Sequence, residues 1–177
     1  MLKRDARFFI ESRACLCSAQ GASAIAVIVK QRDGDLRLAP WPGTVFGAMP
    51  ATAAKETLEL LQSLGLSSDR QDGFHGIAAC AGSTGCDATL ADVRGVAASL
   101  AERLSGKIVP PGWTINLSGC DKQCARRHGA YAELIANDSG FHLKINGESV
   151  QLICSPDSAI GAVVAFHTER LSGVVSL

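Results

Sequence analysis

The N-terminal part of the chain contains short apolar runs separated by turn signals. Residues 24–30 (Ala-Ile-Ala-Val-Ile-Val-Lys) are rich in β-branched side chains, and residues 33–34 (Asp-Gly) follow them as a turn signal. Leu36 and Leu38 then alternate with charged neighbours. Two such runs across a turn predict a β-hairpin. A further short run, residues 44–46, predicts another strand.

A helix is predicted after these strands because leucines recur on one face. Leu58, Leu61 and Leu64 have the spacing of an amphipathic helix. Thr52 is a suitable N-cap residue, and Gly65 is a suitable terminator. Strands with a helix on one side predict an α+β subdomain.

Five short strands are predicted in the second part of the chain. They cover residues 76–80, 113–117, 131–136, 141–145 and 150–153. The third and fourth are expected to form a hairpin across the turn residues 137–140 (Asn-Asp-Ser-Gly). The fifth is expected to add an edge strand.

Two helices are predicted among these strands. The first begins after Cys86, with Asp87 or Thr89 as its N-cap residue, and ends at Gly106. Its apolar face comprises Leu90, Val93, Ala97, Leu100 and Leu104. The second has Pro156 at its first helical position, where proline is favoured.

These patterns divide the chain into three parts. Residues 1–21 show no clear period and form an uncertain leader without an assigned element. Residues 22–73 form the first α+β subdomain, and residues 74–177 form a second, mixed αβ domain. The predicted fold class is therefore α+β.

Composition and charge exclude several classes of protein. Of the 177 residues, 47% are hydrophobic and 19% are charged, as in an ordinary globular chain. Lys and Arg number 17 and so do Asp and Glu, so the chain has no net field that gathers nucleic acid or a membrane surface. Charged residues interrupt the first twenty positions, so these lack the apolar run that an export signal needs. No apolar run in the chain approaches the roughly 20 residues of a membrane span. The expected location is the cytoplasm.

Seven cysteines are the unusual feature of the composition. In a reducing compartment, cysteines more often indicate metal or redox chemistry than disulfides. Cys80 and Cys86 follow one predicted strand directly, and Cys120 and Cys124 follow another. If these two strands are neighbours in a sheet, both loops lie at the same edge and the four thiolates converge. The spacing therefore predicts a four-thiolate site.

The metal at such a site can be argued from the loops. Structural zinc sites usually have tight spacings of two to four residues, which the wider first loop fits less well. A cubane iron–sulfur cluster is larger, and Gly82, Gly85 and Gly119 would let backbone N–H groups approach its sulfurs. A [4Fe–4S] cluster is the favoured interpretation. Zinc and buried thiols without a metal remain the alternatives.

Three segments carry a resemblance to a known family. They are the cysteine pattern Cys80-x5-Cys86 with Cys120-x3-Cys124, residues 117–125 (Leu-Ser-Gly-Cys-Asp-Lys-Gln-Cys-Ala), and residues 38–43 (Leu-Ala-Pro-Trp-Pro-Gly). The cysteine pattern resembles the [4Fe–4S] domain of the nitrite and sulfite reductase family. The other two segments are most similar to its precorrin-3B synthase branch. The resemblance covers about residues 22–155.

The resemblance implies a fold and a cofactor. The fold would be one half of the reductase scaffold, with a ferredoxin-like half-domain at residues 22–73 and the cluster domain at residues 74–177. In the precorrin-3B synthase branch, this is the C-terminal, cluster-bearing half. Cys80, Cys86, Cys120 and Cys124 would hold the [4Fe–4S] cluster. In the reductases, a sirohaem iron is bridged to the cluster through the last cysteine, here Cys124.

The resemblance also implies a reaction and partners. The precorrin-3B synthase branch uses its cluster with a mononuclear iron and dioxygen to hydroxylate precorrin-3A in cobalamin biosynthesis. A half-length match implies a second half, supplied by another copy of this chain as a homodimer or by a separately encoded protein, together with an electron donor. Alternatives are a sirohaem reductase-like electron-transfer subunit without its own catalysis, a remnant that keeps only its cluster, and a zinc-stabilised binding module.

A basic group surrounds the last cysteine. It comprises Lys122, Arg126, Arg127 and His128. These side chains are candidates for contacts with the carboxylates of a tetrapyrrole substrate or with a small oxyanion, and the alternative is a solvated surface turn. The run at residues 126–129 departs from the Cys-Ala-His-Pro that is usual in the precorrin-3B synthase branch.

The remaining chemistry-bearing side chains are expected to be structural. This set comprises Arg94, Cys15, Cys17, Cys154, His75, His142 and His167. No catalytic residue is assigned from the sequence.

Overall fold

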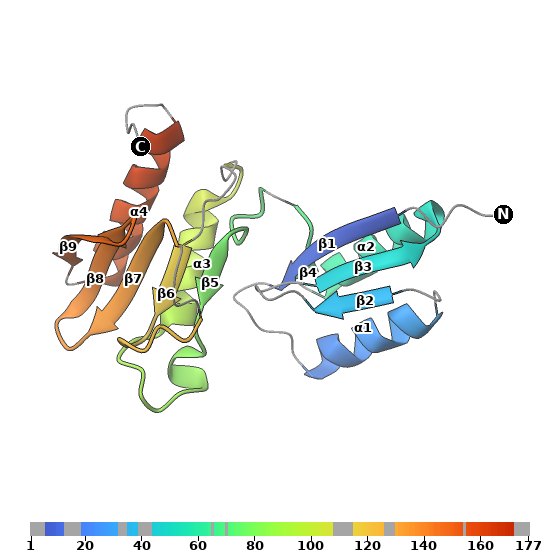
Figure 1. Ribbon diagram of the computed structural model, residues 1–177, viewed down its shortest axis with the longest axis horizontal. Coiled ribbons are helices and arrows are strands. Elements are labelled where there is room, and N and C mark those ends of the chain that lie inside the picture. The colour runs from blue at the N-terminus through green and yellow to red at the C-terminus, as the bar shows by residue number, and fades with distance from the viewer. Residues whose placement is uncertain are drawn as a thin grey trace. The chain divides into compact units, whose positions relative to one another are not determined.

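The computed structural model describes residues 6–12, 19–31, 35–38, 44–64, 66–69, 71–107, 115–125, 130–153 and 155–171. The chain divides into two compact units, residues 1–69 and residues 70–177 (Figure 1). Each unit has its own sheet. Among the described residues, no helix combines the length and the apolar character needed to cross a membrane.

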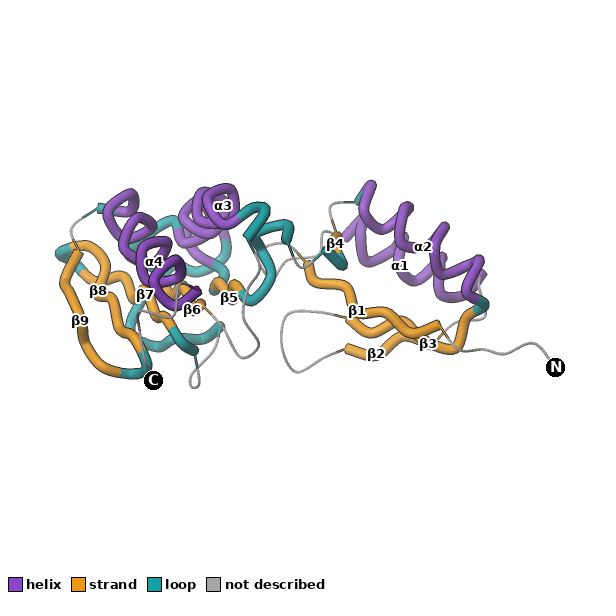
Figure 2. Tube along the Cα trace, turned by 90° about the horizontal axis from the view of Figure 1, so that it is seen from above, coloured by secondary structure: helices purple, strands orange, loops and turns teal. Residues whose placement is uncertain are grey.

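The first unit is an antiparallel sheet with two helices. Its elements are β1 (Ala6–Ser12), α1 (Ala19–Gln31), β2 (Asp35–Leu38), β3 (Thr44–Met49), α2 (Ala51–Ser63) and β4 (Leu66–Ser67). The strand order is β2-β3-β1-β4. Figure 2 shows both helices on the same face of this sheet. Strand β1 lies within residues 1–21, to which the sequence pattern assigned no element.

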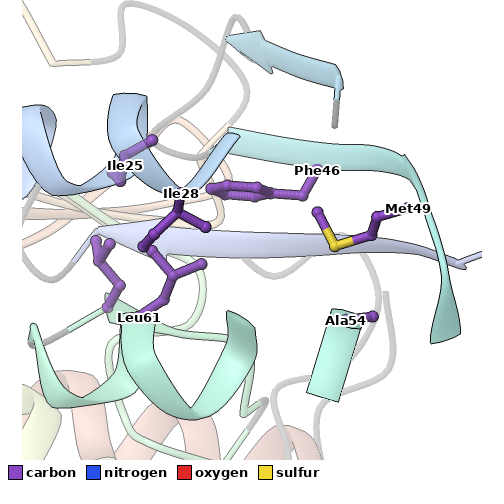
Figure 3. Packing of buried hydrophobic residues seen from close by; sticks show 7 residues of the cluster. Ile25, Ile28, Phe46, Met49, Ala54 and Leu61 are labelled. Carbon is purple, nitrogen blue, oxygen red and sulfur yellow. The ribbon is translucent and has the colours of Figure 1, made fainter. Parts of the chain in front are cut away.

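The core of the first unit lies between the helices and the sheet. It comprises Ile25, Ile28, Phe46, Met49, Ala54, Leu61 and Leu66 (Figure 3). Leu58 is partly buried against it. Apolar residues from both helices, from β3 and from β4 therefore form one continuous cluster.

The predicted hairpin over residues 24–38 is wrong, because residues 19–31 form α1. The buried positions Gly21, Ile25 and Ile28 have steps of four and three residues, which is the helical period. Val27, in the middle of the β-branched run, is exposed. Tertiary packing of one helical face has therefore outweighed local β-propensity.

Helix α2 is close to its predicted position, but its cap and one face residue differ. The N-cap residue is Pro50, and Thr52 lies exposed inside the first turn. Leu61 is fully buried, whereas Leu64 is 40% exposed. Gly65 lies outside the described residues.

The second unit is a mixed sheet with two helices. Its elements are β5 (Ile77–Ala79), the 3-10 turn η2 (Gly82–Thr84), α3 (Val93–Leu104), β6 (Ile115–Ser118), β7 (Ala132–Asn137), β8 (Gly140–Ile145), β9 (Glu148–Ile153) and α4 (Pro156–Leu171). The strand order is β5-β6-β7-β8-β9. The first three strands are parallel, and β7, β8 and β9 are antiparallel. All five predicted strands are confirmed, including the hairpin between β7 and β8.

Helices α3 and α4 cover one face of this second sheet (Figure 2). The largest fully buried side chains of the unit are Leu100, Leu104, Ile115, Leu117, Leu134, Leu143, Ile160 and His167. They come from both helices and from three adjacent strands, so the sheet and its helices form a single core. The predicted α+β class is confirmed.

Helix α3 begins later than its sequence pattern predicts. Its N-cap residue is Asp92, whose Oδ1 accepts a hydrogen bond from the Gly95 N–H at 3.1 Å. Asp87 and Thr89 therefore do not cap it. Leu90 lies before the helix and is 53% exposed. The carboxylate at position 92 is the stronger start signal because it reaches an N–H of the first turn.

Candidate metal centre

The two cysteine loops leave the same edge of the second sheet. Strand β5 ends at Ala79, directly before Cys80, and β6 ends at Ser118, two residues before Cys120. The two strands are parallel neighbours, with Ile77 opposite Ile115. Carboxyl ends of parallel strands meet at one edge, so the predicted adjacency of the two loops is confirmed.

Backbone hydrogen bonds join the two loops. The Cys80 N–H donates to the Leu117 carbonyl at 3.0 Å, which continues the β5–β6 pairing by one residue. The Gly119 N–H donates to the Cys80 sulfur at 3.2 Å. A thiolate in this place would gain more from that hydrogen bond than a thiol, because the acceptor is charged. Cys80 is therefore fixed to the residue that precedes Cys120.

The segment after Cys86 also contacts Gly119. The Leu90 N–H donates to the Gly119 carbonyl at 2.7 Å. A Cβ atom added at Gly119 would collide with the Thr89 side chain, whose own Cβ is 2.9 Å from that position. Gly119 is thus required by close approach, and it joins both cysteine loops.

The loop between Cys80 and Cys86 is a tight turn. Gly82 has a φ of +64°, which favours glycine, and it begins η2. The Gly85 N–H donates to the Gly82 carbonyl at 3.1 Å. This hydrogen bond closes the turn between the two cysteines.

The second loop also contains a left-handed residue. Gln123, directly before Cys124, has a φ of 49°. Cys80, Cys86 and Cys120 are half-buried, and Cys124 is exposed. All four are free thiols.

Within the described part of the chain, no three His, Cys, Asp or Glu side chains are grouped closely enough to hold a metal ion. The fit to a thiolate-bound metal therefore rests on the placement and chemistry of the donors. Four thiols lie in two hydrogen-bonded loops at one sheet edge, and a backbone N–H already points at one sulfur. Soft thiolate ligands suit zinc and iron–sulfur clusters.

Arg94, for which the sequence predicted a structural role, lies beside the loop between Cys80 and Cys86. Arg94 is the second residue of α3, and its Nη2 is 3.7 Å from the position that a Cβ on Gly85 would occupy. Its Nε is buried and has no hydrogen-bond partner among the described residues. The sequence pattern starts this helix soon after Cys86 and so puts Arg94 beyond its first turn, and the unfavourable place of a cation at the helix N-terminus could not be recognised before the structure placed Val93 at the start of α3.

The other predicted contacts are placed only in part. Lys122 is exposed, in the loop between Cys120 and Cys124. Arg126, Arg127 and His128 lie outside the described residues, as do Cys15, Cys17 and Cys154. His142 is half-buried in β8, and His167 is fully buried in α4, consistent with structural roles. His75 precedes β5 and is half-buried.

The fold matches part of a solved structure. A solved structure of the NirA protein of Mycobacterium tuberculosis superposes with a TM-score of 0.72 at 22% sequence identity, covering 89% of this chain and 34% of NirA. The α+β assignment to a part of this scaffold is thereby confirmed.

Sequence comparison identifies particular relatives. A precorrin-3B synthase of Sinorhizobium sp. is 37% identical over 113 residues, which are 63% of this chain and 24% of that protein. The large subunit of a nitrite reductase [NAD(P)H] of Klebsiella oxytoca is 32% identical over 71 residues, which are 40% of this chain and 7% of the subunit. No protein-family model matches. The chain is similar to parts of precorrin-3B synthase and of the nitrite reductase large subunit, and it spans about a quarter of the former.

Proposed function

We propose that Cys80, Cys86, Cys120 and Cys124 hold a [4Fe–4S] cluster. The observation that carries this proposal is the pair of hydrogen-bonded cysteine loops at the carboxyl ends of two parallel strands. A bound cluster would accept and pass on single electrons. The contribution of this chain is to hold the four thiolates and to direct the Gly119 N–H at the sulfur of Cys80.

The loop geometry favours a cluster over zinc. Structural zinc sites form compact knuckles with closely spaced ligands. Here η2 lies between Cys80 and Cys86, so this pair is spaced more widely along the chain than the ligands of a zinc knuckle. A cluster with ligands at its four corners tolerates this separation better than a single ion. The similarity to precorrin-3B synthase and nitrite reductase supports the same choice.

Anaerobic reconstitution with ferrous iron and sulfide tests the cluster. We expect about four irons and four acid-labile sulfides per chain, with the broad visible absorption of such a cluster. Cys80→Ser and Cys120→Ser are expected to lose most of the bound iron, because each removes one thiolate from a different loop. Cys15→Ser is the matched control and should retain it. Stoichiometric zinc without colour would contradict the cluster and favour the zinc-stabilised binding module.

For the reaction, we propose a precorrin-3B synthase-like oxidoreductase that hydroxylates a tetrapyrrole with dioxygen. The similarity over 113 residues supports it. The carboxylates of such a substrate would be met by Lys122, in the second cysteine loop, and by Arg126, Arg127 and His128. Because the chain spans only part of its relatives, we propose that a second copy or a separate protein completes the substrate site, and that a further protein donates electrons.

The second candidate is a sirohaem-dependent reductase subunit, supported by the match to the nitrite reductase large subunit. Titrating the reconstituted protein with sirohaem distinguishes the two. Sharp sirohaem bands that saturate at one per chain would favour the reductase subunit. Absence of these bands, with tetrapyrrole-dependent oxygen uptake when a second half is supplied, would favour the synthase.

A further inference from the structure

The side chain of Arg94 lies across the turn that joins two of the proposed cluster ligands. Helix α3 contacts η2, the turn between Cys80 and Cys86. The Cγ of Arg94 is 3.7 Å from the Cβ position of Gly82, and its Nη2 is 3.7 Å from that of Gly85. The aliphatic stem therefore covers the start of the turn, and the guanidinium reaches the residue directly before Cys86.

In the protein without a bound ligand, the surroundings of the Arg94 guanidinium do not account for its position. The Nε is buried and has no hydrogen-bond partner among the described residues. None of the ion pairs in the described part of the chain involves Arg94. An unpaired buried donor is costly, and a cation at a helix N-terminus opposes the dipole. Both costs would be offset by a negatively charged group in the cysteine loops.

We propose that Arg94 is a positioning residue for the cluster: its guanidinium donates a hydrogen bond from Nε to a cluster or cysteine sulfur and sets the reduction potential. This inference rests on the proposed function. Reduction adds one electron from a low-potential donor and makes the cluster with its four thiolates one unit more negative. A fixed cation beside it stabilises the reduced form more than the oxidised form, and so raises the potential.

The test is the midpoint potential of the reconstituted protein, titrated anaerobically with sodium dithionite. We expect Arg94→Gln to bind its electron about tenfold more weakly, which lowers the potential of this one-electron couple by about 59 mV. Arg103→Gln is the matched control. It makes the same charge change on the same helix, about 13 Å further along the axis and beyond the screening length at physiological salt. Its potential should equal that of the wild-type protein.

A second measurement separates this role from a structural one. In the metal-free protein, Arg94→Gln is expected to keep or raise the unfolding midpoint, because it removes a buried donor without a partner. A merely structural arginine would instead lower that midpoint. A lower midpoint in metal-free Arg94→Gln, with an unchanged potential in the reconstituted variant, would overturn the proposal.

The outcomes distinguish this inference from the proposed function. If the wild-type protein takes up iron and sulfide but Arg94→Gln has its potential, the inference is wrong and the cluster stands. If the wild-type protein takes up none, both fail. If Arg94→Gln cannot be reconstituted, Arg94→Met decides: it removes both the charge and the Nε donor and keeps an unbranched stem, so a lowered potential supports the inference and an unchanged one overturns it.

Discussion

Gly119 lies where the two cysteine loops meet, and its lack of a side chain has a measurable consequence. Gly119→Ala would push a methyl group into Thr89, so we expect a loss of about 1–3 kcal/mol in the free energy of unfolding, as for other overpacked sites. Iron uptake should fall with it, because the Gly119 N–H would move away from the Cys80 sulfur. Urea unfolding and iron analysis measure the two effects.

Two further variants identify the cause of the Gly119→Ala effect. A Cβ at Gly161, in α4, meets no atom within 4 Å, so Gly161→Ala should leave stability unchanged or raise it by up to about 1 kcal/mol. Thr89→Ala combined with Gly119→Ala should recover part of the loss, since it removes the hydroxyl that the methyl group meets first. Additive losses in the double variant would contradict a direct collision.

The placement of the two cysteine loops at one sheet edge could be predicted from the sequence, whereas the placement of Arg94 could not. Each cysteine pair follows a short apolar strand, and the ends of parallel strands meet by geometry, so Cys80 and Cys120 could be brought together from the sequence. Arg94 could not, because its place over Gly85 depends on where α3 begins and on the direction of a long side chain. Thr89 is a second example. Its position in the sequence suggested an N-cap residue, whereas in the structure its side chain lies against Gly119.

The start of α3 fixes where Arg94 lies, and it depends on Asp92. Asp92→Ala removes the acceptor for the Gly95 N–H, so we expect a loss of about 1 kcal/mol in the free energy of unfolding. Asp87→Ala makes the same charge change in the same segment at an exposed position that does not cap the helix. Urea unfolding of both variants should therefore show a loss only at position 92, and equal losses would assign the effect to charge rather than to capping.

Helix α1 shows why part of the fold could not be predicted from local sequence. Its run from Ala24 to Val29 has the side chains of a strand, yet only every third or fourth position is buried. The deciding contact is with Phe46 of β3 and Leu61 of α2, distant in sequence. In the second unit, Ile115 and Leu117 lie in a sheet buried by its neighbours, so the apolar run and the observed strand agree.

At the scale of the whole molecule, the four proposed ligands all lie in the second unit, residues 70–177, and none lies in the first. A ligand that binds only the folded form stabilises the unit that holds it. We therefore expect cluster loading to slow amide hydrogen exchange in β5, β6 and α3, with little change in β3 and α2. Anaerobic exchange read peptide by peptide measures this, with Cys120→Ser taken through the same reconstitution as the control. Equal protection of both units on loading would show instead that they unfold as one, and that the core around Phe46 and Leu61 depends on the cysteine loops.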